Sequence, residues 1–166
     1  MNQDEREAPA GRFRPRITLR TLGRGDGLLG MRPSAALGPR GGEVTIAWVT
    51  WTCADGQGGS WELPAPATIA NRRPAAARFL LDDRGRRVLL RDVDAEADAL
   101  DRIWDLGLLP LPADSLQWRD AAARDRLQGP LWTLAQETLF ADFWADRLPE
   151  LQSEGWSVVI GPGFAH

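Results

Sequence analysis

The sequence of 166 residues contains no lysine, so all twenty basic residues are arginine. A Walker A loop needs a lysine to reach the nucleotide phosphates, and a Schiff-base enzyme needs one as its nucleophile. Both kinds of site are therefore excluded for this chain. Tyrosine is also absent, and His166 is the only histidine. A hydrolase of the Ser-His-Asp or Cys-His type needs an imidazole held in place, and we expect a terminal residue to be too frayed for that role.

Cysteine and long apolar runs are equally scarce. Cys53 is the only cysteine, so no internal disulfide can form, which predicts a reducing, cytoplasmic location. Zinc sites use clustered Cys and His, and we expect neither a metal nor a cofactor here. No run of eighteen apolar residues occurs, so no membrane partner or membrane span is predicted. The polar, acidic first seven residues are unlike a secretory signal.

Composition and charge indicate one globular domain with uneven charge. Apolar residues make up 43% and charged residues 26% of the chain, which is typical of a single folded domain of this length. Residues 1–91 hold fifteen Arg against nine Asp and Glu, a net charge of +6, whereas residues 92–166 hold five against fourteen, a net charge of −9. This asymmetry suits a basic face for an anionic partner, or simply two halves that attract each other or lie in solvent.

The N-terminal half predicts strands. Residues 12–22 alternate, with Ile17 and Leu19 on one side and Arg14, Arg16 and Arg20 on the other, the pattern of a half-buried strand. Pro15 cannot donate to a ladder, so this strand should begin after it or lie at an edge. The three arginines are candidate contacts to double-stranded DNA, the alternative being a merely solvated face. Further strands are predicted at residues 44–53 and 61–63, and a hairpin at 78–81 and 86–90.

A glycine-rich stretch and the polar N-terminus predict no site. Residues 25–30 match G-x-G-x-x-G, but Pro33 and Pro39 follow too closely for the helix that a dinucleotide site requires. We predict a loop there. Residues 1–11 are polar with no apolar period, so we predict a disordered tail followed by a single domain at residues 12–166.

Two helices are predicted in the C-terminal half. The first follows Asp92 and ends near Gly107, with Asp98 and Arg102 as an i,i+4 ion pair. Residues 108–129 form a connector with a short helix near 114–127. The second helix starts at Pro130 and carries two apolar stripes, which predict burial on two sides. The stripes are Trp132, Ala135, Leu139 and Phe143, and beside them Phe140, Trp144 and Leu148.

The last residues predict a helix end, a stop and a strand. Pro149 should kink or restart the second helix, Gly155 should end it, and residues 156–160 read as a strand. Because the chain stops soon after this strand, we expect the partner of the strand to lie beyond His166, in a truncated or detached piece of a longer protein. The expected fold class is α+β, with an antiparallel sheet from residues 12–91, two main helices packed on it and a C-terminal strand.

Two motifs give the chain a resemblance. They are Arg91-Asp92-x-x-x-Glu96, and Leu148-Pro149-x-Leu151-x-x-x-Gly155-Trp156-x-Val158 followed by Phe164-Ala165. In their order, and over roughly residues 13–165, they resemble the accessory region upstream of the motor in bacterial SWI/SNF-type DEAD/DEAH-box helicases. The resemblance implies a parent protein that moves along double-stranded DNA using ATP, with the motor domain as a partner in the same chain. It implies structural motif positions, which are Arg91, Asp92, Glu96, Leu148, Pro149, Gly155, Trp156 and Phe164, and no catalytic residue.

Three functions fit these observations to different extents. The first is a non-catalytic accessory region that contacts a helicase motor or DNA. The second is a stand-alone interaction module that presents some of its eight tryptophans to a protein partner. The third is a small enzyme using Asp92, Asp94 or Asp142 as acid or base, for which the spacing indicates no pocket.

Overall fold

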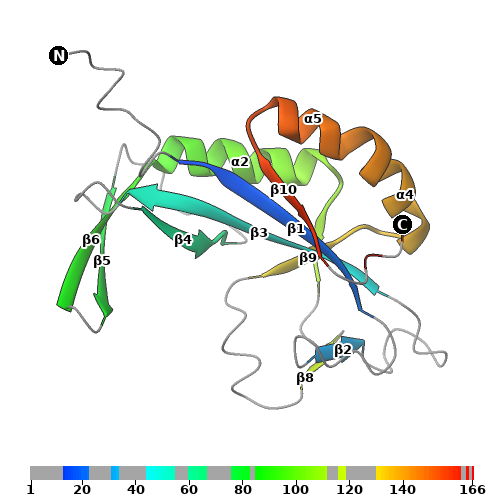
Figure 1. Ribbon diagram of the computed structural model, residues 1–166, viewed down its shortest axis with the longest axis horizontal. Coiled ribbons are helices and arrows are strands. Elements are labelled where there is room, and N and C mark those ends of the chain that lie inside the picture. Colours follow the sequence, from blue (N-terminus) through cyan, green and yellow to red (C-terminus); the bar gives the residue numbers. More distant parts are fainter. Residues whose placement is uncertain are drawn as a thin grey trace.

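The computed structural model describes residues 13–22, 31–33, 44–54, 60–66, 76–82, 85–111, 116–118, 130–161, 164 and 166. The polar tail, the 25–30 loop and most of the 108–129 connector lie outside them. The main sheet has eight strands, and two further short strands, β2 (Met31–Pro33) and β8 (Leu116–Trp118), pair with each other. Within the described residues, two helices accompany these strands in an α+β fold, as predicted (Figure 1).

The sheet is built around strand β3 (Val44–Ala54), the longest strand among the described residues. It pairs antiparallel with β1 (Pro15–Leu22), β4 (Ser60–Pro64), β6 (Gly85–Arg91) and β9 (Leu131–Thr133). Strand β9 also pairs with the two-residue β7 (Leu109–Pro110). Pro15 is the first residue of β1, where its missing N–H removes no interior ladder bond. The predicted strands at 12–22, 44–53 and 61–63 are confirmed.

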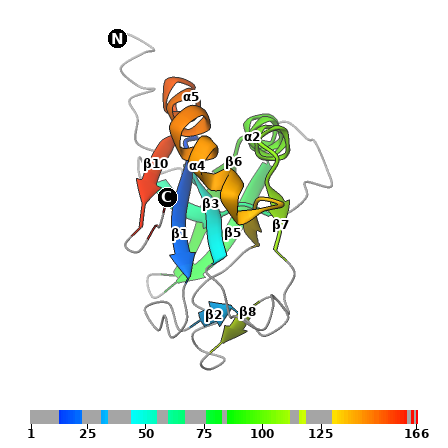
Figure 2. The same cartoon turned by 90° about the vertical axis from the view of Figure 1, so that its right-hand side faces the viewer.

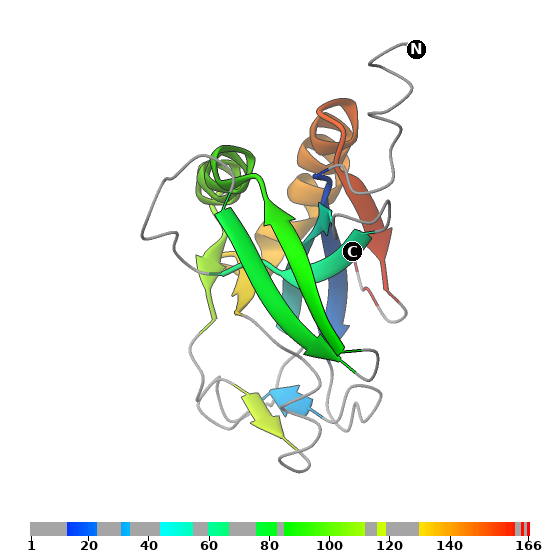
Figure 3. The same ribbon diagram turned by 90° about the vertical axis from the view of Figure 1, so that its left-hand side faces the viewer.

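The hairpin predicted at 78–90 is also present. Strands β5 (Ala76–Asp82) and β6 pair along their whole length, from Ala76 opposite Arg91 to Asp82 opposite Gly85. Figure 3 shows this hairpin as a long twisted ribbon at one end of the sheet. It joins β3 through the single register pair Ala54–Leu90, so it extends away from the layers that form the core.

Both helices pack on one face of the sheet, side by side (Figures 1 and 2). Ile17 and Leu19 of β1 share one buried cluster with Ile103 of the first helix and Phe140 and Leu151 of the second. The opposite face of the sheet is covered by neither helix. It holds a second, smaller buried cluster made of Leu22, Ile46 and Leu131, with Val44, Trp48 and Leu111 packed against it.

The first helix, α2 (Val93–Asp105), has the boundaries that its sequence predicts. The Asp92 carboxylate accepts a hydrogen bond of 3.0 Å from the N–H of Ala95, as an N-cap does. Gly107 follows the helix with φ +81°, a conformation that glycine adopts without strain. The predicted pair of Asp98 with Arg102 is wrong, because Arg102 turns toward the second helix.

The second helix starts later than predicted. Residues Leu131–Thr133 form β9, since Trp132 is completely buried in the core beside Ala47 of β3. The helix then runs over residues 137–153 as a 3₁₀ turn (Glu137–Leu139), α4 (Phe140–Asp142), a π-helical turn (Phe143–Arg147) and α5 (Leu148–Ser153). A helix start at Pro130 is therefore wrong, and strand β8 occupies part of the short helix expected at 114–127.

The composite helix 137–153 is buried on one side only. Phe140, Phe143, Leu148 and Leu151 face the core, whereas Leu139 and Trp144 are 44% and 43% exposed. The prediction of two buried stripes is wrong, because Ala135 and Leu139 of one stripe and Trp144 of the other are exposed. Asp142 and Asp146 are exposed.

The strand at the end of the chain has its partner inside the chain. Strand β10 (Ser157–Ile160) pairs in parallel with β1, from Ser157 opposite Arg16 to Ile160 opposite Leu19. Gly155, with φ +95°, makes the turn into it, as predicted. The prediction that the partner of residues 156–160 lies beyond His166 is therefore wrong. Among the described residues, neither helix is long and apolar enough to span a membrane.

Candidate interaction surfaces

The three arginines predicted to contact DNA lie on the helix-free face of the sheet. Ile17 and Leu19 point into the core below the helices, so Arg14, Arg16 and Arg20, which alternate with them, are on the other side. Arg14 and Arg16 are exposed and Arg20 is half-buried. A Cβ placed on Gly161 would lie 3.1 Å from Nε of Arg20, so this guanidinium lies against the end of β10. We call these three residues the arginine row.

One member of the row already has a carboxylate partner. Nη1 of Arg16 lies 3.0 Å from Oε2 of Glu62 on β4, in an exposed ion pair. The hydroxyl of Thr50 donates to the other oxygen of Glu62 at 2.5 Å. Within the described residues, Arg14 and Arg20 have no carboxylate within ion-pair distance. Within the row, Arg14 and Arg20 are therefore the two whose positive charge is not offset by an ion pair among the described residues.

The outer surface of the helix layer carries the opposite charge. Exposed carboxylates recur along α2 at helical spacing, and others follow along the composite helix. They are Asp94, Asp98, Asp101 and Asp105, and Asp142, Asp146, Glu150 and Glu154. Arg102 and Arg147 are the cations of the same helical residues. The molecule therefore has an acidic helix layer and an arginine row on the opposite side of the sheet.

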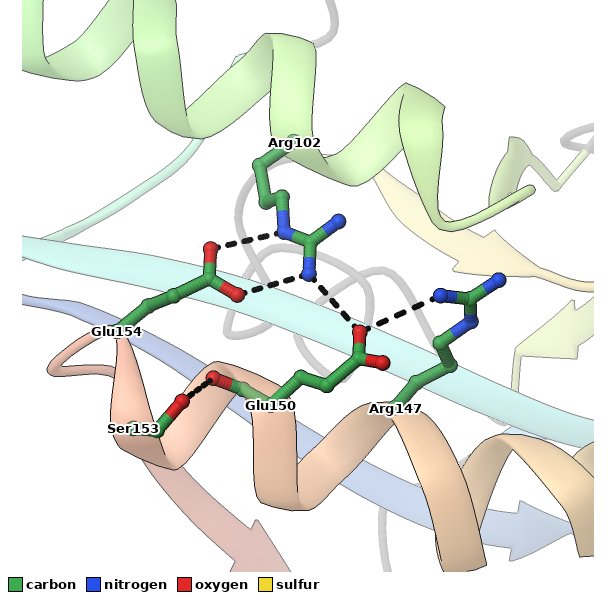
Figure 4. A network of polar contacts seen from close by, with 5 residues as sticks. All are labelled: Arg102, Arg147, Glu150, Ser153 and Glu154. Atoms are coloured by element: carbon green, nitrogen blue, oxygen red, sulfur yellow. Dashed lines mark hydrogen bonds and ion pairs between the residues drawn. The ribbon is translucent and has the colours of Figure 1, made fainter.

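Arg102 joins the two helices through a polar network (Figure 4). Its Nε and Nη2 donate to the two oxygens of Glu154 at 2.9 and 2.7 Å, and Nη2 also donates to Glu150 at 3.2 Å. Glu150 accepts a further bond of 3.3 Å from Arg147. The hydrogen bond to Glu154 raises the pKa of Arg102. The bonds from Arg147 and then Arg102 lower the pKa of Glu150.

A groove of about 960 Å³ runs beside this network, between the start of β1, α2 and the turn into β10. Phe13, Ala99 and Trp156 supply apolar lining, and charges of both signs line it as well, among them Asp98 and Asp105 of α2 and Arg14 and Arg16 at the start of β1. A lining of balanced charge selects neither an anionic nor a cationic ligand. The groove shows no preference that would identify an occupant.

A second polar cluster involves the histidine. The hydroxyl and N–H of Thr45 both donate to Glu137, the latter at 2.9 Å, and Nε2 of His166 lies 3.0 Å from Oε1 of Glu137. The imidazole also stacks on Phe140, with ring centroids 6.0 Å apart. The expectation that a terminal imidazole cannot be held in place is therefore wrong. Glu137 lies between Thr45 and His166, so this is not the nucleophile–His–acid order of a hydrolase.

The motif positions of the resemblance have structural roles. Asp92 caps α2, Gly155 turns the chain, and Pro149 occupies the first turn of α5. Leu148 and Trp156 are core residues, and Glu96 is 2% exposed within α2. Phe164 packs against Trp144 and His166. Arg91 is the last residue of β6, and its side chain lies outside the described residues.

The carboxylates considered as catalytic are not brought together. Asp92 is engaged in capping, while Asp94 and Asp142 are exposed on different helices. In the described part of the chain, no group of three or more His, Cys, Asp or Glu side chains could hold a metal ion. The surface residues that sequence reasoning missed are Leu139 and Trp144, which it assigned to buried stripes but which are 44% and 43% exposed.

Comparison of the chain with family models finds no match, and comparisons with curated proteins and with solved structures find no significant match either.

Proposed function

We propose that this chain is a non-catalytic accessory region of a SWI/SNF-type DNA translocase, which contacts DNA weakly through the arginine row. The observation that supports it is the position of Arg14, Arg16 and Arg20 on the face of the sheet that neither helix covers. The motif resemblance supplies the parent class. ATP hydrolysis would belong to the motor domain, since this chain has no lysine for a Walker A loop.

The dimensions of the row suit a duplex backbone. From Arg14 to Arg20 a strand spans about 20 Å at roughly 3.3 Å per residue, equal to about six steps of 3.4 Å along one DNA strand. Guanidinium groups bind phosphates through paired N–H donors. Three contacts give weak binding without base specificity, since phosphate contacts alone carry no sequence information.

The direct test is binding of a labelled DNA duplex at low salt. Replacing Arg14, Arg16 and Arg20 together with Gln should lower the affinity about tenfold or more, because each lost cation removes a phosphate contact. The matched control is Arg147→Gln, an exposed arginine on the acidic helix layer, which should bind like the wild type. Equal affinities for wild type and the triple variant would show that the row is merely solvated.

A gain-of-binding variant sharpens this test. Glu62 pairs with Arg16 at 3.0 Å and places a negative charge beside the row. Glu62→Gln keeps an acceptor for the Thr50 hydroxyl while removing that charge, so it should strengthen DNA binding by about two- to fivefold. Unchanged or weaker binding by Glu62→Gln would count against phosphate contact at Arg16.

The resemblance itself is tested by the reading frame. In the parent gene, the stretch downstream of the codons for this chain should encode a Gly-Lys-Thr phosphate loop. An unrelated downstream sequence would end the proposal of a translocase parent, whatever the DNA-binding result.

A stand-alone protein-interaction module is the second candidate. The observation that favours it is the exposure of Trp104 and Trp144, at 44% and 43%, since tryptophan is favoured at the centres of interfaces. Size-exclusion chromatography and tryptophan emission test it. A monomer whose tryptophans all emit at buried-type wavelengths would contradict an exposed aromatic surface.

A further inference from the structure

A second groove lies on the helix layer, away from the arginine row. It runs between the end of α2 and the composite helix, with a volume of about 880 Å³. Its floor is apolar and combines buried and exposed residues from the end of α2, from the segment between β9 and the composite helix, and from the composite helix itself. The floor residues are Leu106, Gly107, Leu134, Ala135, Leu139, Phe143 and Ala145. We call it the helix groove.

Four of the five residues of the π-helical turn Phe143–Arg147 line the helix groove, all except Trp144. Pro149 explains this turn: a proline has no N–H to donate and its ring clashes with the carbonyl four residues earlier, which is that of Ala145. The N–H of Leu148 accordingly bonds to the carbonyl of Phe143, five residues back. The wider turn presents Phe143, Asp146 and Arg147 to the groove together, and such turns are common at functional sites.

The rim of the helix groove carries unbalanced negative charge. Glu150 and Arg147 neutralise each other at 3.3 Å. Asp142 and Asp146 also line the groove, are exposed, and have no cationic partner within the described residues. An apolar floor with an acidic rim is complementary to a segment with apolar anchors and basic flanks.

We infer that the helix groove is a docking site for an amphipathic helix of a protein partner, one that carries Leu-type anchors on one face and Arg or Lys beside them. Leu139, exposed at 44%, is the apolar side chain that such a helix would cover. Asp142 and Asp146 would pair with its basic residues. DNA is disfavoured here by the same carboxylates, and a second copy would bring two acidic helix layers together. This inference goes beyond DNA contact and does not depend on it.

The probe is a synthetic, labelled peptide of about 18 residues, or five helical turns. It has Leu at i, i+3, i+4 and i+7 spacing and Arg and Ala elsewhere. Two control peptides are a scramble that destroys the apolar stripe and a version with Glu in place of Arg. Binding is followed by fluorescence anisotropy at moderate salt, with the full chain as the protein.

We expect saturable binding of the amphipathic basic peptide, and binding about tenfold weaker for both control peptides. Leu139→Ser, and the double change of Asp142→Asn with Asp146→Asn, should each weaken binding by a similar factor. The matched control Asp94→Asn removes an exposed carboxylate of α2 that does not line the groove, and should bind like the wild type.

Three results would overturn the inference: no saturable binding, equal binding of the scrambled peptide, or a loss with Asp142 and Asp146 changed but none with Leu139→Ser. The last result would indicate unspecific attraction to the acidic layer. The triple Gln variant of the arginine row should bind the peptide normally. A failure of DNA contact and a failure of the helix groove are therefore separate outcomes.

Discussion

Arg102 is the residue that ties the two helices of the outer layer together. It makes two charge-assisted bonds to Glu154 and a third to Glu150. Paired guanidinium–carboxylate bonds of this kind are stronger than single exposed ion pairs. Its side chain is 25% exposed, so solvent screening keeps its contribution near the upper end of the range for surface ion pairs, which is about 1 kcal/mol.

Replacing Arg102 with Met should lower the free energy of unfolding by about 1 kcal/mol, which is roughly 2–4 °C in Tm for a chain of this size. Methionine keeps most of the apolar stem of the arginine side chain, so the loss of stability measures the hydrogen bonds and ion pairs that Arg102 makes. The matched control is Arg147→Met, which removes one 3.3 Å contact between residues three apart and should change stability little. Equal losses in the two variants would contradict the special role of Arg102.

Glu150 predicts a dependence of stability on pH. Hydrogen bonds from Arg147 and Arg102 lower its pKa below the ordinary value of 4.5. The folded state thus favours the carboxylate, so the stabilisation is present above about pH 4.5 and is lost as pH falls through the lowered pKa. Denaturant unfolding from about pH 6 to about pH 3 should show a shallower decline for Glu150→Gln than for the wild type. The same dependence of stability on pH in the wild type and in Glu150→Gln would contradict this role of Glu150. Asp142→Asn is the control, because it also removes an exposed carboxylate.

Gly155 has a conformational role that alanine cannot fill. Its φ is +95°, and a Cβ added there would meet nothing within 4 Å. Gly155→Ala should therefore cost about 1 kcal/mol from backbone strain alone. Gln152→Ala, on the exposed side of α5, should stay within about 0.5 kcal/mol of the wild type in denaturant unfolding. An unchanged free energy of unfolding in Gly155→Ala would contradict this role, because it would show that the turn adjusts to an alanine without strain.

At the scale of elements, local patterns predicted β1, β3, the β5–β6 hairpin and α2. Each of these elements has its own period of apolar residues and a sequence signal at its ends, such as the Asp92 cap before α2 or Gly107 after it. The parallel pairing of β10 with β1 had no local signal, because the partners lie about 140 residues apart and meet only through the core. No turn geometry fixes such a register.

The second helix shows how a helical period can mislead. Trp132 falls in step with Leu139 and Phe143, yet it belongs to β9 and is buried by pairing with β3. Tertiary burial overrode the local pattern over residues 131–133. The candidate surfaces were only partly predictable for the same reason. The arginine row follows from strand alternation, whereas the helix groove depends on a π-helical turn and on packing between two helices.

A pair of tryptophan variants checks which side of the second helix is buried. Trp156 is 6% exposed in the core, and Trp144 is 43% exposed. Trp156→Ala should cost roughly 3–5 kcal/mol and reduce the amide-exchange protection of β10. Trp144→Ala, which loses mainly its contact to Phe164, should cost less than about 1.5 kcal/mol. Equal costs would mean that both stripes are buried after all.

At the scale of the whole molecule, the uneven charge of the sequence becomes a difference between two faces. Most of the described carboxylates of the acidic C-terminal half lie on the exposed surface of the two helices, and the arginine row lies on the far side of the sheet. Counting charges could indicate an asymmetry but could not place it, because a face exists only once the strands have paired. The polarity would keep a bound duplex on the sheet side and leave the helix layer to a basic protein segment.

The salt dependence of DNA binding tests this account most directly. For the wild type, the logarithm of the association constant should fall linearly with the logarithm of salt concentration, with a slope of about −0.9 per phosphate neutralised. The variant with Arg14, Arg16 and Arg20 changed to Gln should have a slope smaller in magnitude by about 2.7, which is about 0.9 for each of the three lost phosphate contacts, while Arg147→Gln should keep the slope of the wild type. The same slope in the wild type and the triple variant would contradict the proposal that the arginine row contacts DNA.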